Sequence, residues 1–260
     1  MTMTADVQGN RLLAALPQAD RERWLARLEP VMLRRDQVLY DAGVAPSHAY
    51  FPTTAIVSLM YIEADGASTE TAVVGREGLV GAALLLGGES TCGRAVVRRA
   101  GEGFRIGAQA ISEEFTRSAD VTRLLLRGLQ AQITQTAQTS VCNRHHTIGQ
   151  QLCRCLLMTH DRSVSDTLDL TQETLGTLIG VRRESVTQAA LQLQDAGLIR
   201  YGRGHIRILD RAGLERAACE CYEVVRREYD RLLPPPRRAP APPTDTMAAE
   251  PRRARGRVHA

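Results

Sequence analysis

Residues 74–97, VGREGLVGAALLLGGESTCGRAVV, contain six glycines between apolar runs, with Glu77 and Arg94 among them. Backbone N–H groups of a glycine-rich loop and a nearby guanidinium are groups that hold a phosphate. A carboxylate at the same place could accept a hydrogen bond from a ribose hydroxyl. The first question that the sequence raises is therefore whether this loop binds a nucleotide.

A second stretch, residues 170–210, has the spacing of a small DNA-binding unit. Thr171 can cap a short helix, and Gly180 permits a tight turn before a second helix that starts near Arg182. Gly197 ends the second helix, and the following LIRYGRGHIRILD predicts a two-stranded wing that turns at residues 202–204. The pattern predicts a winged helix-turn-helix. The residues expected to face inward are Leu175, Leu178, Ile179, Val186, Ala190 and Leu193.

The opposite face of the second helix carries side chains that can read bases: Arg183, Glu184, Thr187 and Gln188. Arginine can bind guanine through two hydrogen bonds, glutamate can accept one from cytosine, and glutamine can pair with adenine. Five arginines face two acidic residues between residues 182 and 207, so this segment is locally basic. We expect it to bind double-stranded DNA in the major groove. The alternative is a winged helix that contacts proteins.

The cysteines and histidines predict no metal site and no cofactor. The two CxC pairs lie in helical patterns, where a spacing of two residues separates the side chains by about 200°. His145 and His146 are adjacent, so they diverge by about 100° around a helix. Reduced cysteines are the simple expectation, and a thiol redox sensor that uses Cys92 or Cys142 is the alternative. The six cysteines are Cys92, Cys142, Cys153, Cys155, Cys219 and Cys221.

The composition is that of a globular protein large enough for two domains, with 260 residues and 43% hydrophobic residues. No apolar run is long enough to span a membrane, and the first 20 residues lack a signal-peptide pattern, so we expect a cytoplasmic protein without a membrane partner. No Ser-His-Asp order, P-loop or HExxH occurs, so the sequence does not predict an enzyme. Residues 234–260 are rich in proline and arginine and are expected to be disordered.

The elements that must position these residues follow from periodicity. Residues 9–29 predict a helix that Pro30 ends, and residues 112–161 predict a mainly helical stretch. Seven short β-like runs separated by turn residues lie between them and predict an antiparallel barrel or roll. The fold class is α+β. The seven runs start at residues 31, 37, 49, 55, 68, 93 and 103.

Within the long helical stretch, apolar residues recur every four positions. Such a stripe needs a partner surface, and a parallel copy from a second subunit would supply one. We expect a homodimer; the alternative is that the helix packs only on its own roll. The stripe consists of Val121, Leu125, Leu129, Ile133 and Ala137.

The segment LTQETLGTLIGVRRESVTQAALQLQDAGLI closely resembles the DNA-binding domain of the Crp/Fnr transcription regulators. AYFPTTAIVSLMYI and the following strands resemble the β-roll of that family, and residues 119–146 resemble its dimerisation helix. The resemblance covers residues 10–233. It implies a double-stranded β-roll sensor domain at 10–118, dimerisation and connecting helices at 119–162, a winged helix-turn-helix at 163–233, and a basic tail at 234–260. It also implies a homodimer that reads a pseudo-palindromic operator, with RNA polymerase as a partner and an unknown small-molecule effector.

The same resemblance assigns roles to residues. Arg183 and Glu184 match base-reading positions, and Gln188 stands at a third one that is often arginine in the family, which leaves the operator sequence open. Thr187 lies on the same face. The residues expected to contact phosphates are Thr171, Gln172, Arg182, Ser185 and, in the wing, Arg203.

Cyclic-nucleotide-binding members of this family carry a Gly-Glu pair for the ribose and an arginine for the phosphate. Here Gly81 is kept, but Ala82 stands at the glutamate position and Cys92 at the arginine position. We therefore expect a degenerate loop and an effector other than a cyclic nucleotide. The alternative is a shifted site around Gly75 in which Glu77 and Arg94 take over the missing roles.

Overall fold

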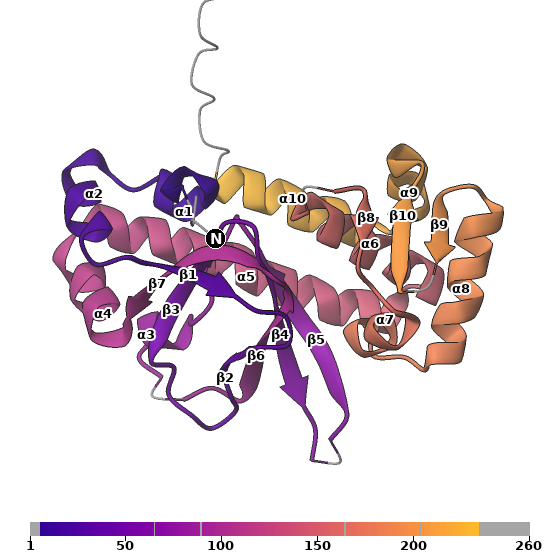
Figure 1. Cartoon of the computed structure of the whole chain (residues 1–260), viewed down its shortest axis with the longest axis horizontal. Coiled ribbons are helices and arrows are strands. Elements are labelled where there is room, and N and C mark those ends of the chain that lie inside the picture. The colour runs from indigo at the N-terminus through magenta and orange to yellow at the C-terminus, as the bar shows by residue number, and fades with distance from the viewer. Residues whose placement is uncertain (1–5, 65, 89, 164, 203, 234–260) are drawn as a thin grey trace, which may run out of the picture.

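The computed structural model describes residues 6–233 except residues 65, 89, 164 and 203. The predicted tail at 234–260 and the wing residue Arg203 lie outside the described residues. Figure 1 shows strands at one end, a group of short helices with a small sheet at the other, and one long helix running between them.

The helix predicted over residues 9–29 is wrong as a single element. Pro17 interrupts it and precedes the second helix, whose first residue is Gln18. Asn10 caps the start of α1 (Arg11–Ala14): its buried side chain accepts hydrogen bonds from the amides of Leu12 and Leu13 and donates to the carbonyls of Pro52 and Gly78 in the roll. The elements are η1 (Val7–Gly9), α1 (Arg11–Ala14) and α2 (Gln18–Leu25).

The seven predicted strands are confirmed, and they form two antiparallel sheets. One has the order β1-β7-β3 and the other β2-β6-β4-β5. Phe51 of the first sheet and Ile56 of the second are fully buried in a common core, where the ring of Trp24 packs edge-on at 6.0 Å from Phe51. The strands are β1 (Glu29–Leu33), β2 (Val38–Tyr40), β3 (His48–Pro52), β4 (Ile56–Ile62), β5 (Ser68–Val74), β6 (Gly93–Arg99) and β7 (Gly101–Gly107).

The stretch 112–161 is helical as predicted and consists of three helices, the first of which already begins at Ala108. Ser118 caps the start of the second through a hydrogen bond to the Val121 amide, and Thr147 and Gln150 form a capping box at the start of the third. With 27 residues the second helix is about 40 Å long. The helices are α4 (Ala108–Arg117), α5 (Ala119–His145) and α6 (Ile148–Asp161), after a short α3 (Ala83–Leu86) in the roll.

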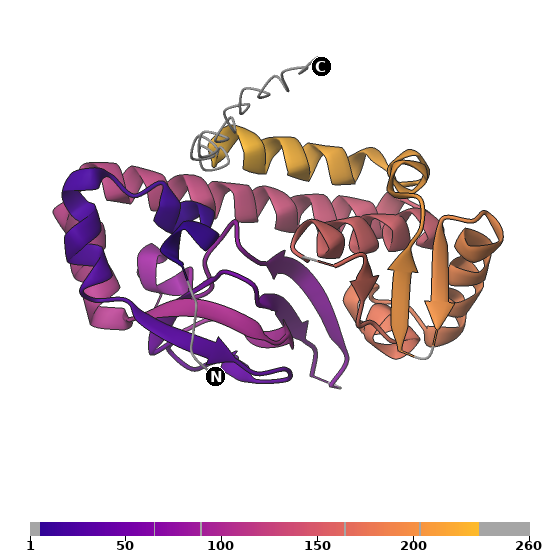
Figure 2. The same cartoon turned by 45° about the horizontal axis from the view of Figure 1, so that its top comes forward.

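The predicted winged helix-turn-helix is present, with α7 (Gln172–Ile179) and α8 (Arg183–Asp195) followed by two wing strands. A last helix, α10 (Glu220–Leu232), leaves this unit and runs back along α5 towards the roll (Figure 2). There Arg11 forms an ion pair with Asp230 at 3.2 Å. The residues expected to form one C-terminal domain therefore include a helix that packs mainly on α5. The remaining elements are β8 (Thr167–Leu168), β9 (Ile199–Gly202), β10 (His205–Ile208) and α9 (Arg211–Ala217).

The apolar stripe predicted on α5 is not a single free face. Val121, Leu125 and Leu129 are buried within the chain, as the alternative of packing on the own roll predicted. Ile133 and Ala137 are exposed, Ile133 by 62%. The prediction of a shared dimer seam is wrong for the first three positions, because their side chains belong to the hydrophobic core that the chain forms by itself.

None of the described helices is long and apolar enough to cross a membrane.

Candidate nucleic-acid interface

The turn between α7 and α8 is fixed by caps and glycines. The Thr171 hydroxyl accepts a hydrogen bond from the Thr174 amide at 3.0 Å and so caps α7, as predicted. Gly180 ends α7 with φ of +69°, a conformation that favours glycine. A side chain at Gly176 would lie 2.9 Å from the carbonyl oxygen of Val181, so the close approach of the two helices requires glycine there.

The buried face of α8 holds it against α6 and α7. Val186 is fully buried, and Ala190 and Leu193 are nearly so, as the periodicity predicted. Ala189 belongs to the same face. Because this face is anchored by apolar packing, the opposite face of α8 must point to solvent.

That opposite face presents Arg183, Glu184 and Gln188, all exposed. Among the described residues none forms an ion pair or a hydrogen bond with the side chain of Arg183 or of Glu184. Thr187 is half-buried, and its hydroxyl donates to the Arg183 carbonyl at 3.0 Å. Leu191, which the sequence analysis did not single out, extends the exposed face by one turn.

The residues expected at phosphates surround this face. Arg182 is the N-terminal cap residue of α8 and is exposed, whereas Gln172 and Ser185 are half-buried. In the wing, Arg200 and Arg207 are exposed and add positive charge that the sequence analysis counted but did not assign. The helix N-terminus contributes partial positive charge of its own. The described part of the wing thus carries two basic side chains beside α8.

The glycine-rich loop holds an arginine of the chain itself. The Glu77 carboxylate is buried and accepts a hydrogen bond from Nε of Arg162, the residue that follows α6, at 2.7 Å. Arg162 also donates to the Met158 carbonyl at 2.7 Å and to the Gln135 side chain at 3.2 Å. A side chain at Gly75 would lie 2.8 Å from Cγ of Arg162, so this glycine leaves room for the arginine.

Arg94, the second residue of the alternative nucleotide site, forms an ion pair with Asp41 and, in the described part of the chain, none with the loop around Glu77. It donates two hydrogen bonds to the Asp41 carboxylate, at 2.8 and 2.7 Å, and this guanidinium lowers the pKa of Asp41. A cleft of about 710 Å³ between the roll, α6 and α10 is lined by Glu77 but not by Arg94. Within the described residues Glu77 and Arg94 therefore have separate partners in the chain.

The positions that match the ribose- and phosphate-binding residues of cyclic-nucleotide-binding members have other structural roles here. Ala82 precedes α3 as its cap residue, and Cys92 is exposed. Gly81 has φ of +107°, and a side chain there would lie 3.1 Å from the His48 carbonyl oxygen. The kept glycine therefore serves a turn of the roll.

The comparison with known proteins supports this architecture. Residues 150–217 match the Crp-like helix-turn-helix domain. A putative Crp/Fnr transcriptional regulator from Eubacterium rectale superposes with a TM-score of 0.64 at 15% identity, covering 79% of this chain and 96% of its own. The chain has the Crp/Fnr fold.

Two further structures with this Crp/Fnr fold are similar. FixK2 from Bradyrhizobium japonicum has a TM-score of 0.63 and 17% identity, covering 74% of this chain and 98% of its own. The c-di-GMP responsive global regulator CLP of Xanthomonas campestris has a TM-score of 0.59 and 17% identity, covering 74% of this chain and 99% of its own. No curated protein matches this chain in sequence.

Only one of the two CxC pairs is helical. Cys153 and Cys155 lie in α6 as expected, but Cys219 is the extended residue that precedes α10, so the expectation of a helical pair is wrong for Cys219 and Cys221. His146 likewise lies just beyond α5. Sequence spacing could not show that Cys219 and His146 lie close to Cys142.

Replacing Glu77 tests whether its ion pair with Arg162 stabilises the folded chain. Glu77→Ala leaves the Arg162 charge buried without its carboxylate, which should lower the free energy of unfolding by about 3–5 kcal/mol. Urea unfolding followed by circular dichroism measures the change. Glu63→Ala, at an exposed residue of the same roll, is the control.

A double variant separates charge from packing. Glu77→Ala with Arg162→Met removes the unpaired charge and should destabilise the chain less than Glu77→Ala alone. An unfolding midpoint of Glu77→Ala equal to that of the unchanged protein would show that the ion pair does not stabilise this loop.

Proposed function

We propose that the chain is a sequence-specific DNA-binding transcription regulator of the Crp/Fnr type and not an enzyme. The observation that carries the proposal is the exposed face of α8, where the side chains of Arg183 and Glu184 have no partner among the described residues. The buried face of the same helix fixes its orientation through Val186 and Ala190. A rigid helix with unpaired base-reading side chains fits the major groove.

The arrangement of charge supports the same proposal. Arg182 stands at the helix start and Arg200 and Arg207 on the wing, where phosphates on either side of a groove would lie. Arg183 is suited to guanine and Glu184 to cytosine. Thr171 and Gln172 lie at the start of α7 for a further backbone contact, and Arg203, Ser185, Thr187 and Gln188 keep the roles expected from the resemblance.

We further propose that two copies pair through α5. Its exposed residues recur with alternating steps of three and four, the spacing of a coiled-coil seam, and include Leu126, Ile133 and Ala137. Leu86 of α3 is 61% exposed and lines an apolar groove beside Ile133. Paired α5 helices would present two α8 helices to half-sites about 34 Å apart on a pseudo-palindrome.

The effector is proposed to be something other than a cyclic nucleotide. Glu77 and Arg94 each have a partner in the chain, and Ala82 and Cys92 supply neither a carboxylate nor a positive charge. RNA polymerase and an unidentified small molecule are the remaining proposed partners, and the proposed location is the cytoplasm.

Substitution of the two neighbouring arginines distinguishes base reading from phosphate contact. Arg183→Ala should cost about 1–3 kcal/mol of binding and relax the base preference at one position of each half-site. Arg182→Ala should weaken binding evenly over all sequences and reduce its salt dependence. Selection of sites from a random DNA pool measures both. An unchanged consensus for Arg183→Ala would show that α8 does not read bases as proposed.

A charge placed on the exposed stripe tests the dimer. Ile133→Glu should shift the protein from dimer to monomer, because two carboxylates would meet in an apolar seam. Sedimentation velocity measures the mass. Val44→Glu, at an exposed residue of a roll loop, should leave the dimer intact. A dimer that survives Ile133→Glu would place the interface elsewhere.

Calorimetry tests the effector proposal. Titration with cyclic AMP and cyclic GMP should give no binding heat, because the buried pair with Arg162 occupies Glu77. Micromolar binding that Arg94→Ala abolishes would instead establish the shifted nucleotide site.

A further inference from the structure

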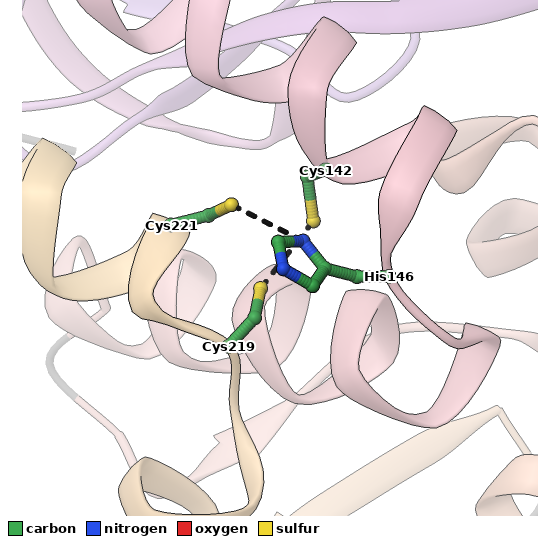
Figure 3. Close-up of side chains that lie close together, drawn as sticks. All are labelled: Cys142, His146, Cys219 and Cys221. Carbon is green, nitrogen blue, oxygen red and sulfur yellow. Dashed lines mark hydrogen bonds between the residues drawn. The ribbon is translucent and has the colours of Figure 1, made fainter.

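Three cysteines and a histidine meet where α5 ends and α10 begins. Figure 3 shows Cys142, His146, Cys219 and Cys221 pointing towards one another from these two parts of the chain. Their ligand atoms all lie within 4.8 Å of one another. The three cysteines are buried, and His146 is half-buried. The site lies apart from the exposed face of α8 and from the loop around Glu77.

The local structure explains why the four side chains converge. Cys142 is in the last turn of α5, and His146 follows the helix in an extended conformation, so its ring folds back beside Cys142. Cys219 is extended and precedes α10, whereas Cys221 is in the first turn of that helix. The change of backbone conformation between Cys219 and Cys221 lets both sulfurs face the same point.

The distances are those of ligands around one small ion. The sulfurs of Cys142 and Cys219 are 3.5 Å apart, and the Cys221 sulfur is 3.4 Å from Nδ1 of His146. A tetrahedral zinc ion with Zn–S of about 2.3 Å and Zn–N of about 2.05 Å separates its sulfur ligands by about 3.8 Å and sulfur from nitrogen by about 3.6 Å. These two distances are a few tenths of an ångström shorter than in such a site, and all the ligand atoms lie within 4.8 Å of one another, so side-chain shifts of about 1 Å or less would close the four ligands around the ion.

Two polar side chains outside the cluster contact its members and would orient them as metal ligands. Nε2 of His146 faces the Glu220 carboxylate at 3.4 Å, while Nδ1 faces the Cys221 sulfur. A carboxylate that accepts the second ring N–H of a ligating histidine fixes its tautomer and orientation. The Gln138 amide donates to the Cys221 sulfur at 3.1 Å, which favours the negative charge of a thiolate ligand.

We propose that Cys142, His146, Cys219 and Cys221 bind one Zn²⁺ ion in a closed, structural site. Three thiolates and one imidazole form a Cys₃His ligand set, and no position stays open for a substrate. On binding, the three thiol protons pass to solvent and three Zn–S bonds and one Zn–N bond form, with no change of oxidation state.

The ion would join segments that are far apart in the sequence. Cys142 and Cys219 are 77 residues apart and enclose the whole helix-turn-helix between them. The proposed site therefore fastens the start of α10 to the end of α5, at the junction where α5 gives way to α6.

Metal analysis of the full chain tests the proposal. Protein purified under reducing conditions and dialysed against metal-free buffer should contain one equivalent of zinc by mass spectrometry. Cys142→Ser, Cys219→Ser and His146→Gln should lose it. Cys92→Ser and His145→Gln are matched controls at exposed positions and should retain it. Absence of zinc from the unchanged protein, or full retention by His146→Gln, would overturn the site.

Cobalt provides a measurement that does not depend on variants. Chain stripped of metal by a chelator, kept reduced and shown to be folded by circular dichroism, is titrated with Co²⁺. Thiolate-to-cobalt charge-transfer bands and tetrahedral visible bands should appear and should vanish when Zn²⁺ is added. Their absence, or isolation of the chain with a Cys142–Cys219 disulfide in place of metal, would refute the proposal.

Discussion

The buried guanidinium of Arg162 contacts three separate parts of the molecule, and its hydrogen bonds fix directions that an apolar contact would leave free. It pairs with Glu77 in the roll, donates to Gln135 of α5 and lies over the ring of Tyr229 of α10 at 5.8 Å. A buried charge is tolerated only where its partners are in position. The geometry of this one side chain therefore fixes the roll, α5 and α10 relative to the end of α6.

This pair also explains the glycine-rich loop. Arg162 belongs to the segment that matches the Crp-like helix-turn-helix, whereas Gly75 and Glu77 belong to the roll. A second buried ion pair joins Arg98 and Glu70 of the roll at 3.0 Å. Arg98 also donates a hydrogen bond to the hydroxyl of Thr159 in α6. The roll is thus joined to the C-terminal end of α6 by buried polar contacts of defined geometry.

The parts that could be predicted from sequence are those whose information is local. Strands, turns and the helix-turn-helix follow from alternation, glycine positions and the apolar spacing around Val186, and all were recovered. The partners of Glu77 and Arg94 were not, because Arg162 and Asp41 lie 85 and 53 residues away. The α5 periodicity correctly predicted a helix, but it could not show that Leu125 faces the chain's own core while Ile133 faces outward. Cys219 was placed inside a helix because a helical pattern does not reveal the residue at which the helix begins.

The return of α10 along α5 has a mechanical consequence. A domain that is connected to the rest of a protein by a single helix can rotate about the axis of that helix. The helix-turn-helix is held instead by two lateral supports, α6 on its N-terminal side and α10 on its C-terminal side. Because α10 packs along α5 and also contacts α6, a rotation of the helix-turn-helix about α6 alone would break these contacts. The two connections together therefore oppose twisting of α8 relative to α5.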